Sequence, residues 1–341
     1  MDMEKEKRWE IRRYADSNIK EWDAFVRESR NSTFLFNRSY MDYHSDRFAD
    51  CSLMAYKQGK LRAILPACIL GDTLHSHQGL TYGGWLFPAY GPDGEEILEM
   101  WQEWLEWCDR EKIRKIIYKP VPSFYAGKPS EEDRYCLFSC GGVQTGCGLS
   151  STIRLQDNPG LNKLQRRHLQ SAIKRQTEIK SYSGKIPAEV VEDFHKMLSE
   201  CLQTRHGVKA VHSAGELALL SERFPDHISL HLLLHEGRLE AGVWLFKTDT
   251  CHHCQYIATS AEGRANHSLT LLFVRLIEEA EKAGKIYFDF GISTEEGGRR
   301  LNNGLNRHKT SFGASGTVYE RWEMEVTEAL RRLTADGEDR L

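Results

Sequence analysis

The chain has 341 residues, which is enough for about two domains of roughly 100–200 residues each. Its 46 Lys and Arg are nearly matched by 49 Asp and Glu, and the net charge of −3 provides no overall field for nucleic acid or an anionic membrane. No apolar run approaches the ~20 residues that cross a bilayer, the N-terminus lacks a signal-peptide core, and nine cysteines show no disulfide framework. We therefore expect a cytoplasmic protein with reduced thiols, without a DNA partner or a membrane span.

A hairpin sequence occurs twice in the chain. The segments Tyr56–Ala63 (YKQGKLRA) and Leu234–Ala241 (LHEGRLEA) each place a Gly turn between apolar stretches, which is typical of a β-hairpin. A long helical pattern and a basic-apolar strand follow each copy. The repetition predicts an α/β (α+β) protein of two related lobes, 1–150 and 151–341, with a cleft between them.

The first lobe is predicted to combine a sheet with a strongly apolar helix at 95–110. We interpret the stripe of this helix, which includes Trp101 and Trp104, as core rather than a ligand platform. The lobe boundary is expected between Cys140 and Gly160, where the chain is rich in turn residues. The other elements expected in this lobe are strands at 10–14, 51–56, 61–70 and 112–120 and helices at 18–28 and 38–48.

A glycine-rich and aromatic segment, Gly79–Gly91, interrupts the first lobe. Glycine allows sharp bends and close approach to a ligand, and aromatic rings can stack on one. The segment is either a binding loop or a bulged strand. Tyr82 lies within it.

The second lobe opens on a basic segment, 161–180, in which six Lys or Arg accompany one Glu. Apolar residues can share one helical side, so that Arg166, Arg167 and Lys174 project elsewhere. These cations either form a solvated face or contact phosphate, to which arginine pairs are well suited. The elements expected beyond this segment are helices at 188–205, 214–223 and 268–283 and strands at 228–235, 239–247, 254–259, 287–294 and 317–325.

Four adjacent ligand-type residues, Cys251-His-His-Cys254, form a tempting metal motif. Alternation along a strand sends Cys251 and His253 to one face and His252 and Cys254 to the other, and no second ligand pair lies nearby. We therefore predict no metal site. Walker, GxSxG and HExxH motifs are also absent from the sequence.

Candidate chemistry concentrates near the C-terminal end. A strand ends in Asp289 and Gly291, and a basic stretch with Asn303, His308 and Lys309 follows. Ligands of α/β folds bind at strand ends, which favours a site here.

The pattern FDFGIS from Phe288, followed by GLNRHKTSFG from Gly304, resembles the C-terminal signature of the FemAB-like branch of the GNAT acyltransferase superfamily. The basic segment near Arg166 and the pair Thr204-Arg205 are similar to that branch as well. The resemblance implies two tandem GNAT-like lobes, each a mixed, mostly antiparallel sheet flanked by helices. It also implies transfer of an acyl or aminoacyl group, from acyl-CoA or charged tRNA, to a small-molecule or peptide-type amine of a cell-wall or polysaccharide pathway.

Two features depart from that pattern. GNAT enzymes typically hold the CoA pyrophosphate in a glycine-rich loop after the fourth strand, whereas the segment Ser260–Ser268 has one glycine. No long heptad segment provides the helical arm that some tRNA-dependent relatives carry. A non-catalytic GNAT-like protein that binds a nucleotide sugar or peptide is the alternative function.

The resemblance and the residues together suggest roles for several side chains. Asp289 and His308 are candidate bases for an ammonium acceptor, and Lys309 could stabilise the donor's carbonyl oxygen or a phosphate. Each residue also has a purely structural interpretation as a cap, a solvated charge or part of the core. The candidate substrate-binding residues are Arg205, Arg166, Arg167, Tyr82, Tyr256 and Asn303.

Overall fold

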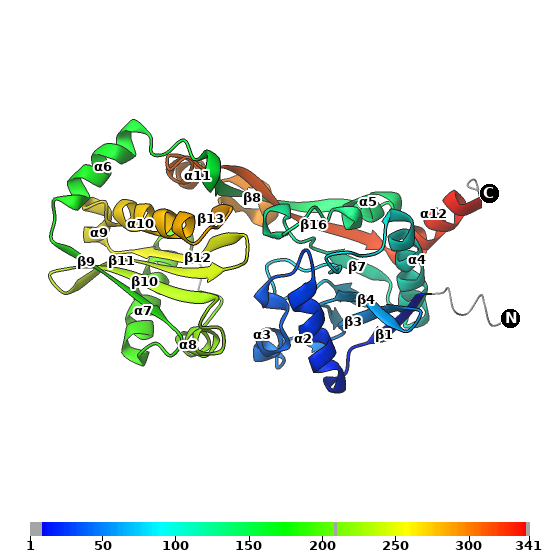
Figure 1. The fold of residues 1–341 in the computed structure, drawn as a ribbon. Helices are drawn as coiled ribbons and strands as arrows, with labels where there is room; N and C mark the ends of the chain where they lie inside the picture. The colour runs from blue at the N-terminus through cyan, green and yellow to red at the C-terminus, as the bar shows by residue number, and fades with distance from the viewer. Residues whose placement is uncertain (1–8, 208–209, 339–341) are drawn as a thin grey trace. The chain divides into compact units, whose positions relative to one another are not determined.

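The computed structural model describes residues 9–207 and 210–338, without the side chains of Arg205, His206 and 335–338. Contacts divide the chain into two compact units (Figure 1). Unit 1 consists of Met1–Gly148, Glu295–Arg300 and Val318–Leu341, and unit 2 of Leu149–Thr294 and Leu301–Thr317. The α/β architecture predicted from the repeat, and the tandem, mixed and mostly antiparallel sheets implied by the family resemblance, are confirmed.

The C-terminal residues 318–341 belong to unit 1, whereas the sequence analysis assigned them to the second lobe. Met324, Val326 and Ala329 are nine-tenths or more buried in the hydrophobic core of unit 1. Burial of this apolar segment against unit 1 explains why the chain returns there after completing unit 2.

Unit 1 contains a sheet with the strand order β2-β5-β6-β7-β16 and a second sheet with the order β1-β3-β4. Strands β8 and β16 have residues in both units. The strands are β1 (Trp9–Arg13), β2 (Ala49–Asp50), β3 (Leu53–Lys57), β4 (Lys60–Leu65), β5 (Cys68–Leu70), β6 (Thr73–His75), β7 (Lys115–Tyr118), β8 (Val143–Arg154) and β16 (Ser315–Glu325). The helices are α2 (Ile19–Glu28), α3 (Arg38–Met41), α4 (Gly94–Arg110), α5 (Glu132–Ser139) and α12 (Val326–Glu338).

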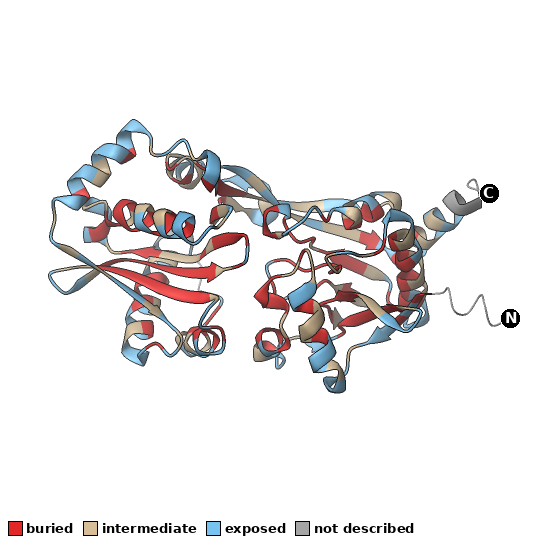
Figure 2. Ribbon diagram, in the orientation of Figure 1, coloured by how far each residue is buried: buried red, intermediate tan, exposed pale blue. Residues whose placement is uncertain are grey.

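The apolar stripe of α4 forms part of the core, as predicted. Trp101 and Trp104 are fully buried, and their rings meet edge to face with centroids 5.0 Å apart. Asp93 caps the helix by accepting a hydrogen bond from the Glu96 backbone N–H at 3.0 Å. Figure 2 shows the buried residues along this helix.

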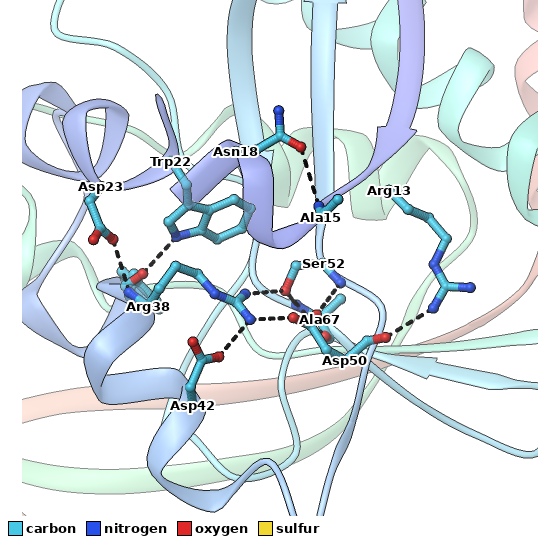
Figure 3. Close-up of polar contacts among 11 residues, drawn as sticks. Arg13, Ala15, Asn18, Trp22, Asp23, Arg38, Asp42, Asp50, Ser52 and Ala67 are labelled. Carbon is cyan, nitrogen blue, oxygen red and sulfur yellow. Dashed lines mark hydrogen bonds and ion pairs between the residues drawn. The ribbon is translucent and has the colours of Figure 1, made fainter. Parts of the chain in front are cut away.

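The helix expected at 38–48 ends at Met41 and continues as a 3-10 turn over Asp42–His44. The buried Arg38 guanidinium donates to carboxylates of Asp42, at 2.6 Å, and Asp50, and to the Ser52 hydroxyl (Figure 3). The two carboxylates compensate the charge of a buried cation inside unit 1. The local polar network, rather than helical periodicity, determines the conformation of this segment.

Unit 2 contains the strand order β8-β13-β12-β11-β10-β9. Helix α7 packs on one face, where Phe194 meets Trp244, and α10 packs on the other with Val243 and Leu245 (Figure 1). The strands are β9 (Thr177–Ser183), β10 (Ile228–His235), β11 (Arg238–Lys247), β12 (Cys251–Thr259) and β13 (Tyr287–Ile292). The helices are α6 (Lys163–Ile173), α7 (Ala188–His206), α8 (Ala214–Arg223), α9 (Ala261–Ala265), α10 (Ser268–Lys282) and α11 (Asn303–Thr310), and the short strands β14 (Thr294–Glu295) and β15 (Arg300–Leu301) pair with each other.

Both repeated hairpins form, as β3–β4 and β10–β11. Their turn residues have positive φ, 54° and 70° at Gln58 and Gly59 and 49° and 76° at Glu236 and Gly237. Each hairpin also contains a β-bulge just after the turn, whose extra residue is Arg62 in the first copy and Glu240 in the second. The two copies therefore share a backbone irregularity as well as a turn.

Candidate functional site

The sheet of unit 2 opens where β12 and β13 separate. The two strands pair in parallel only from Cys251 with Tyr287 to His253 with Asp289, although β12 continues to Thr259 and β13 to Ile292. Gly291, with φ of +78°, lies just beyond the last pair. Beyond the pair of His253 and Asp289, the backbones of β12 and β13 no longer bond to each other. This is the end of the strand at which the sequence indicated a site.

Asp289 and His253 form a hydrogen-bonded pair at this opening. The His253 Nδ1 lies 2.7 Å from Asp289 Oδ2, and the hydroxyls of Ser150 and Thr152 donate to Oδ1 at 2.6 and 2.8 Å. Burial is the largest single influence on the fully buried Asp289 and opposes its ionisation, but the hydrogen bond and charge of His253 and the hydrogen bonds from Ser150 and Thr152 together outweigh burial and lower the pKa of the carboxyl. An ionised carboxylate only accepts, so Nδ1 carries the proton and Nε2 is the basic nitrogen.

The sequence analysis treated His253 only as a member of the metal motif. Asp289 was recognised, but its partner depends on the parallel register of β12 and β13, which periodicity within one strand does not reveal. The one available signal was that His253 directly precedes the predicted strand 254–259 and that Asp289 lies in the next predicted strand of the same lobe.

Lys309 lies near this pair and supports the diverging end of β13. Its Nζ donates to the carbonyls of Gly291 and Ile292, both at 2.7 Å, and the residue is 4% exposed. Burial lowers the pKa of Lys309 to about 8, and the charge of Asp289 counters part of that effect. The ammonium replaces hydrogen bonds that the separated strand has lost, and it leaves a positive charge beside the opening.

A bulge at Gln255 brings Tyr256 to the same face as His253. Tyr256 is opposite Trp244 and His253 is opposite Phe246, and residues directly opposite one another in a sheet share a face. The bulge makes Tyr256 equivalent to the second residue after His253 along the strand. At about 3.3 Å per residue, the two residues are therefore about 7 Å apart. Regular alternation would have placed them on opposite faces.

Tyr256 connects this face to a pocket in unit 2. Its hydroxyl lies 2.5 Å from His212 Nδ1, and His195 Nε2 donates to the His212 carbonyl at 3.0 Å. Burial raises the pKa of the Tyr256 hydroxyl. The pocket has a volume of about 760 Å³ and is lined by His195, Ser199, Glu200, Gln203, Thr204, Ala210, Val211, His212, Ser213 and Glu216.

The segment Ser260–Ser268, which departs from the glycine-rich CoA loop of the GNAT pattern, folds as the short helix α9 and a turn into α10. Gly263 N–H donates to the Ser260 hydroxyl at 3.0 Å, and the backbone N–H groups of Arg264 and His267 also donate within the segment. A side chain at Gly263 would meet the Glu240 carbonyl at 2.0 Å. An open nest of N–H groups for an anion is not formed here.

The carboxylate of Glu240 lies at the start of α10. Arg175 donates two hydrogen bonds to it, both at 2.8 Å, and Asn266 and Ser268 donate as well. The hydrogen bonds from Arg175 lower the pKa of Glu240 to about 2. This negative charge already occupies the helix terminus that would attract a pyrophosphate.

The remaining predicted residues lie elsewhere. Arg166 and Arg167 are exposed on α6. This helix ends at Ile173 and therefore covers only part of the basic segment 161–180. His308 packs against Phe312, with ring centroids 5.3 Å apart, and against Phe273 of α10. The structure therefore places His308 with the aromatic cluster on the α10 side and does not bring it to Asp289.

Asn303 belongs to α11 in unit 2, and Tyr82 belongs to unit 1. Asn303 is exposed at the first position of α11, and its neighbour Asn302 caps the helix. Tyr82, in unit 1, is 4% exposed and its hydroxyl donates to Thr33 at 3.1 Å. The side chain of Arg205 lies outside the described residues.

Within residues 9–207 and 210–338, no group of three or more His, Cys, Asp or Glu could hold a metal ion. Cys251 and Cys254 are buried, and burial raises the pKa of both thiols well above its usual value. None of the described helices is both long and apolar enough to cross a bilayer.

Comparison with known proteins supports the fold. Residues 163–310 match the model of the GNAT acetyltransferase domain. The fold is similar to that of FemX, with a TM-score of 0.67 and 13% identity over 95% of this chain and 99% of that chain. No curated protein sequence matches the chain.

Two further solved structures share the fold. L-PGS from Bacillus licheniformis has a TM-score of 0.59 and 12% identity, covering 92% of this chain and 95% of its own. A tandem GNAT protein from the clavulanic acid biosynthesis pathway has a TM-score of 0.55 and 12% identity, covering 93% and 98%. Residues 163–310 thus match a GNAT acetyltransferase domain, and the chain as a whole shares its fold with FemX and with a tandem GNAT protein.

Proposed function

We propose that unit 2 transfers an acyl or aminoacyl group to an amine, with His253 as the general base and Asp289 as its positioning residue. The observation that carries this proposal is the 2.7 Å contact between His253 Nδ1 and the buried Asp289 carboxylate. A carboxylate that receives Nδ1–H fixes the tautomer in which Nε2 accepts a proton. Asp289 is itself enclosed by donors and is better suited to orientation than to proton transfer.

The proposed reaction is balanced as follows. The acceptor ammonium gives one proton to Nε2 of His253, which later releases it to solvent. The amine nitrogen attacks the donor carbonyl, a C–N bond forms, and the C–O bond of an ester or the C–S bond of a thioester breaks. The leaving oxygen or sulfur takes the second proton from the nitrogen. The positive charge of Lys309 favours the oxyanion that develops.

The pocket of about 760 Å³ is the proposed acceptor site. The carboxylates of Glu200 and Glu216 line it and suit an ammonium group. The Tyr256–His212 hydrogen bond joins its wall to the face that carries His253. We propose that Tyr256 orients the acceptor there, because its hydroxyl is fixed by His212.

An aminoacyl ester of tRNA is the proposed donor. The folded segment 260–268 and the Glu240 carboxylate at the start of α10 disfavour a CoA pyrophosphate at that terminus. An ester on RNA does not need such a pyrophosphate site. The family resemblance leaves these two donor classes, and local electrostatics favours the RNA ester.

The test is a transfer assay with a panel of amines, with charged tRNA and acyl-CoA as alternative donors. His253→Gln is expected to lower kcat by about 10²–10⁴, the usual contribution of a general base, with little change in KM. His252→Gln is the matched control, because His252 precedes His253 in β12 and faces away from Asp289. Thermal unfolding verifies that both variants fold.

Asp289→Asn tests the positioning role. The amide can donate to Nδ1, which favours the tautomer with its proton on Nε2, so kcat should fall and the base limb of the pH profile should shift. Transfer at the wild-type rate by His253→Gln, or binding of acceptors without turnover by the wild-type protein, would contradict the proposed function.

A further inference from the structure

The outward face of α6 concentrates positive charge. At 100° per residue, Arg166, Lys163, Lys174 and Arg167 fall within about 100° of arc, on the side opposite the buried Gln165 and Ala172. These cations, called here the α6 basic face, are exposed and line a hollow of about 440 Å³ with Gln170 and Ser171. From Lys163 to Lys174 the face is about 16 Å long, at 1.5 Å per residue.

The charge of this face is not neutralised by the described part of the protein. Lys163, Arg167 and Lys174 form no ion pair with any described residue, and Arg166 donates to the Leu161 carbonyl at 2.7 Å. The adjacent Arg175, by contrast, points inward and is paired with Glu240. Unpaired like charges on one helix repel each other, so the arrangement favours an external anion.

Helix α6 is firmly attached near the candidate site. Thr270 of α10 donates to the Gln165 side chain at 2.8 Å, and the rings of His168 and His267 stack with centroids 3.6 Å apart. Asn162 N–H donates to the carbonyl of Ser311, directly after α11, the helix that carries Lys309. A partner bound on α6 is therefore held by the same elements that border the opening between β12 and β13.

We infer that the α6 basic face binds the phosphate backbone of the RNA part of a charged tRNA donor. This inference rests on the proposed function, because it assigns a surface to the proposed donor class. Cations occupy the centre of the face, and the half-exposed Leu164 and Ile173 lie at its two edges. An interfacial membrane helix has the reverse order, with an apolar centre and flanking cations, so the pattern favours phosphates of RNA over a lipid surface.

Direct binding of deacylated tRNA tests the inference without requiring transfer. Lys163, Arg166, Arg167 and Lys174 are all replaced by Gln in the full-length protein, and binding is measured by fluorescence anisotropy over a range of salt concentrations. Four lost phosphate contacts should reduce affinity by at least about 100-fold at about 0.1 M salt. The slope of log K against log salt should become shallower by about 3.

A second variant removes equal charge elsewhere. Replacing Lys20, Lys60, Lys185 and Lys282 by Gln lowers the net charge equally at exposed positions outside α6 and should leave affinity within about threefold. Arg167→Glu alone provides a less disruptive variant, with an expected loss of at least about tenfold. Thermal unfolding of each variant verifies folding.

Wild-type affinity in the α6 variants, or an equal loss in the control variant, would overturn the inference. Binding to vesicles that contain phosphatidylglycerol, lost with the α6 substitutions while tRNA binding is absent, would assign the face to a membrane instead. If the protein transfers an acyl group from CoA but does not bind tRNA, this inference and the proposed tRNA donor both fail, while the proposed transfer to an amine by His253 stands. If tRNA binds through α6 and no donor is used, only the transferase proposal fails.

Discussion

Lys309 is buried, and its ammonium donates hydrogen bonds to two backbone carbonyls. Burial holds its pKa at about 8 rather than near 10.5, so at neutral pH the folded protein retains a cation at a cost in stability. Such a cost is more readily explained by a charge needed at the site than by packing alone.

A pH series of unfolding measurements tests this interpretation. Between about pH 8 and 10.5 the unfolded chain binds the Lys309 proton more tightly than the folded protein, so the contribution of Lys309 to the free energy of unfolding rises with pH. Wild type should gain up to about 3 kcal/mol relative to Lys309→Met across this window. Urea unfolding of both proteins at several pH values measures the difference, and parallel curves would refute a depressed pKa.

The sequence identified Lys309 and Asp289 but not how either is used. Both residues belong to the C-terminal sequence pattern that begins at Phe288, and this pattern can be recognised from one sequence alone. His253 joins Asp289 through strand register, and Tyr256 reaches the same face only through the bulge at Gln255. Neither a register nor a bulge follows from the alternation of apolar residues, so these contacts required the structure.

At the scale of elements, the clamp around Glu240 holds together β11, the segment directly after α6, the turn before α10 and the start of α10. Its carboxylate receives hydrogen bonds from Arg175, Asn266 and Ser268. A single side chain therefore connects four segments of unit 2. The turn is consequently expected to be rigid.

Glu240→Gln should reveal the strength of this clamp. The hydrogen bonds from Arg175 lower the Glu240 pKa to about 2, so its stabilisation is complete above about pH 4.5 and is lost as pH falls toward 2. At pH 7 the variant should lose about 2 to 3 kcal/mol of unfolding free energy, and near pH 2 the two proteins should converge. Glu281→Gln, at an exposed position on α10, serves as the control, and a loss that does not depend on pH would argue against the clamp.

Elements with strong local signals were predicted well. The hairpins follow from their glycine turns, and α10 was predicted to within one residue because its apolar residues recur at helical spacing. Helix α11 was missed, since a short polar helix has no apolar stripe. It depends instead on the Asn302 cap and on burial of Lys309.

For the whole molecule, the division into two units predicts which helices are destabilised when a core side chain is shortened. Met324 lies in the core of unit 1, and Phe312 lies in the core of unit 2, although only twelve positions separate them along the chain. Met324→Ala should cost about 2–5 kcal/mol and Phe312→Ala about 3–5 kcal/mol. Hydrogen exchange by mass spectrometry should show faster exchange chiefly in α4 for the first variant and in α10 for the second. Equal acceleration in both helices would mean that the units unfold together.

The matching bulges at Arg62 and Glu240 bear on how the two copies diverged. Each copy retained the same kink after its turn, while the side chain presented there became basic in one and acidic in the other. The bulge position after each turn carries an arginine in one copy and a glutamate in the other, while the hairpin backbone is the same. A side chain at this position can therefore change its charge without changing the hairpin. In unit 2 the side chain at this bulge, Glu240, ties Arg175 and Asn266 to the first residue of α10, so the backbone irregularity fixes the start of that helix.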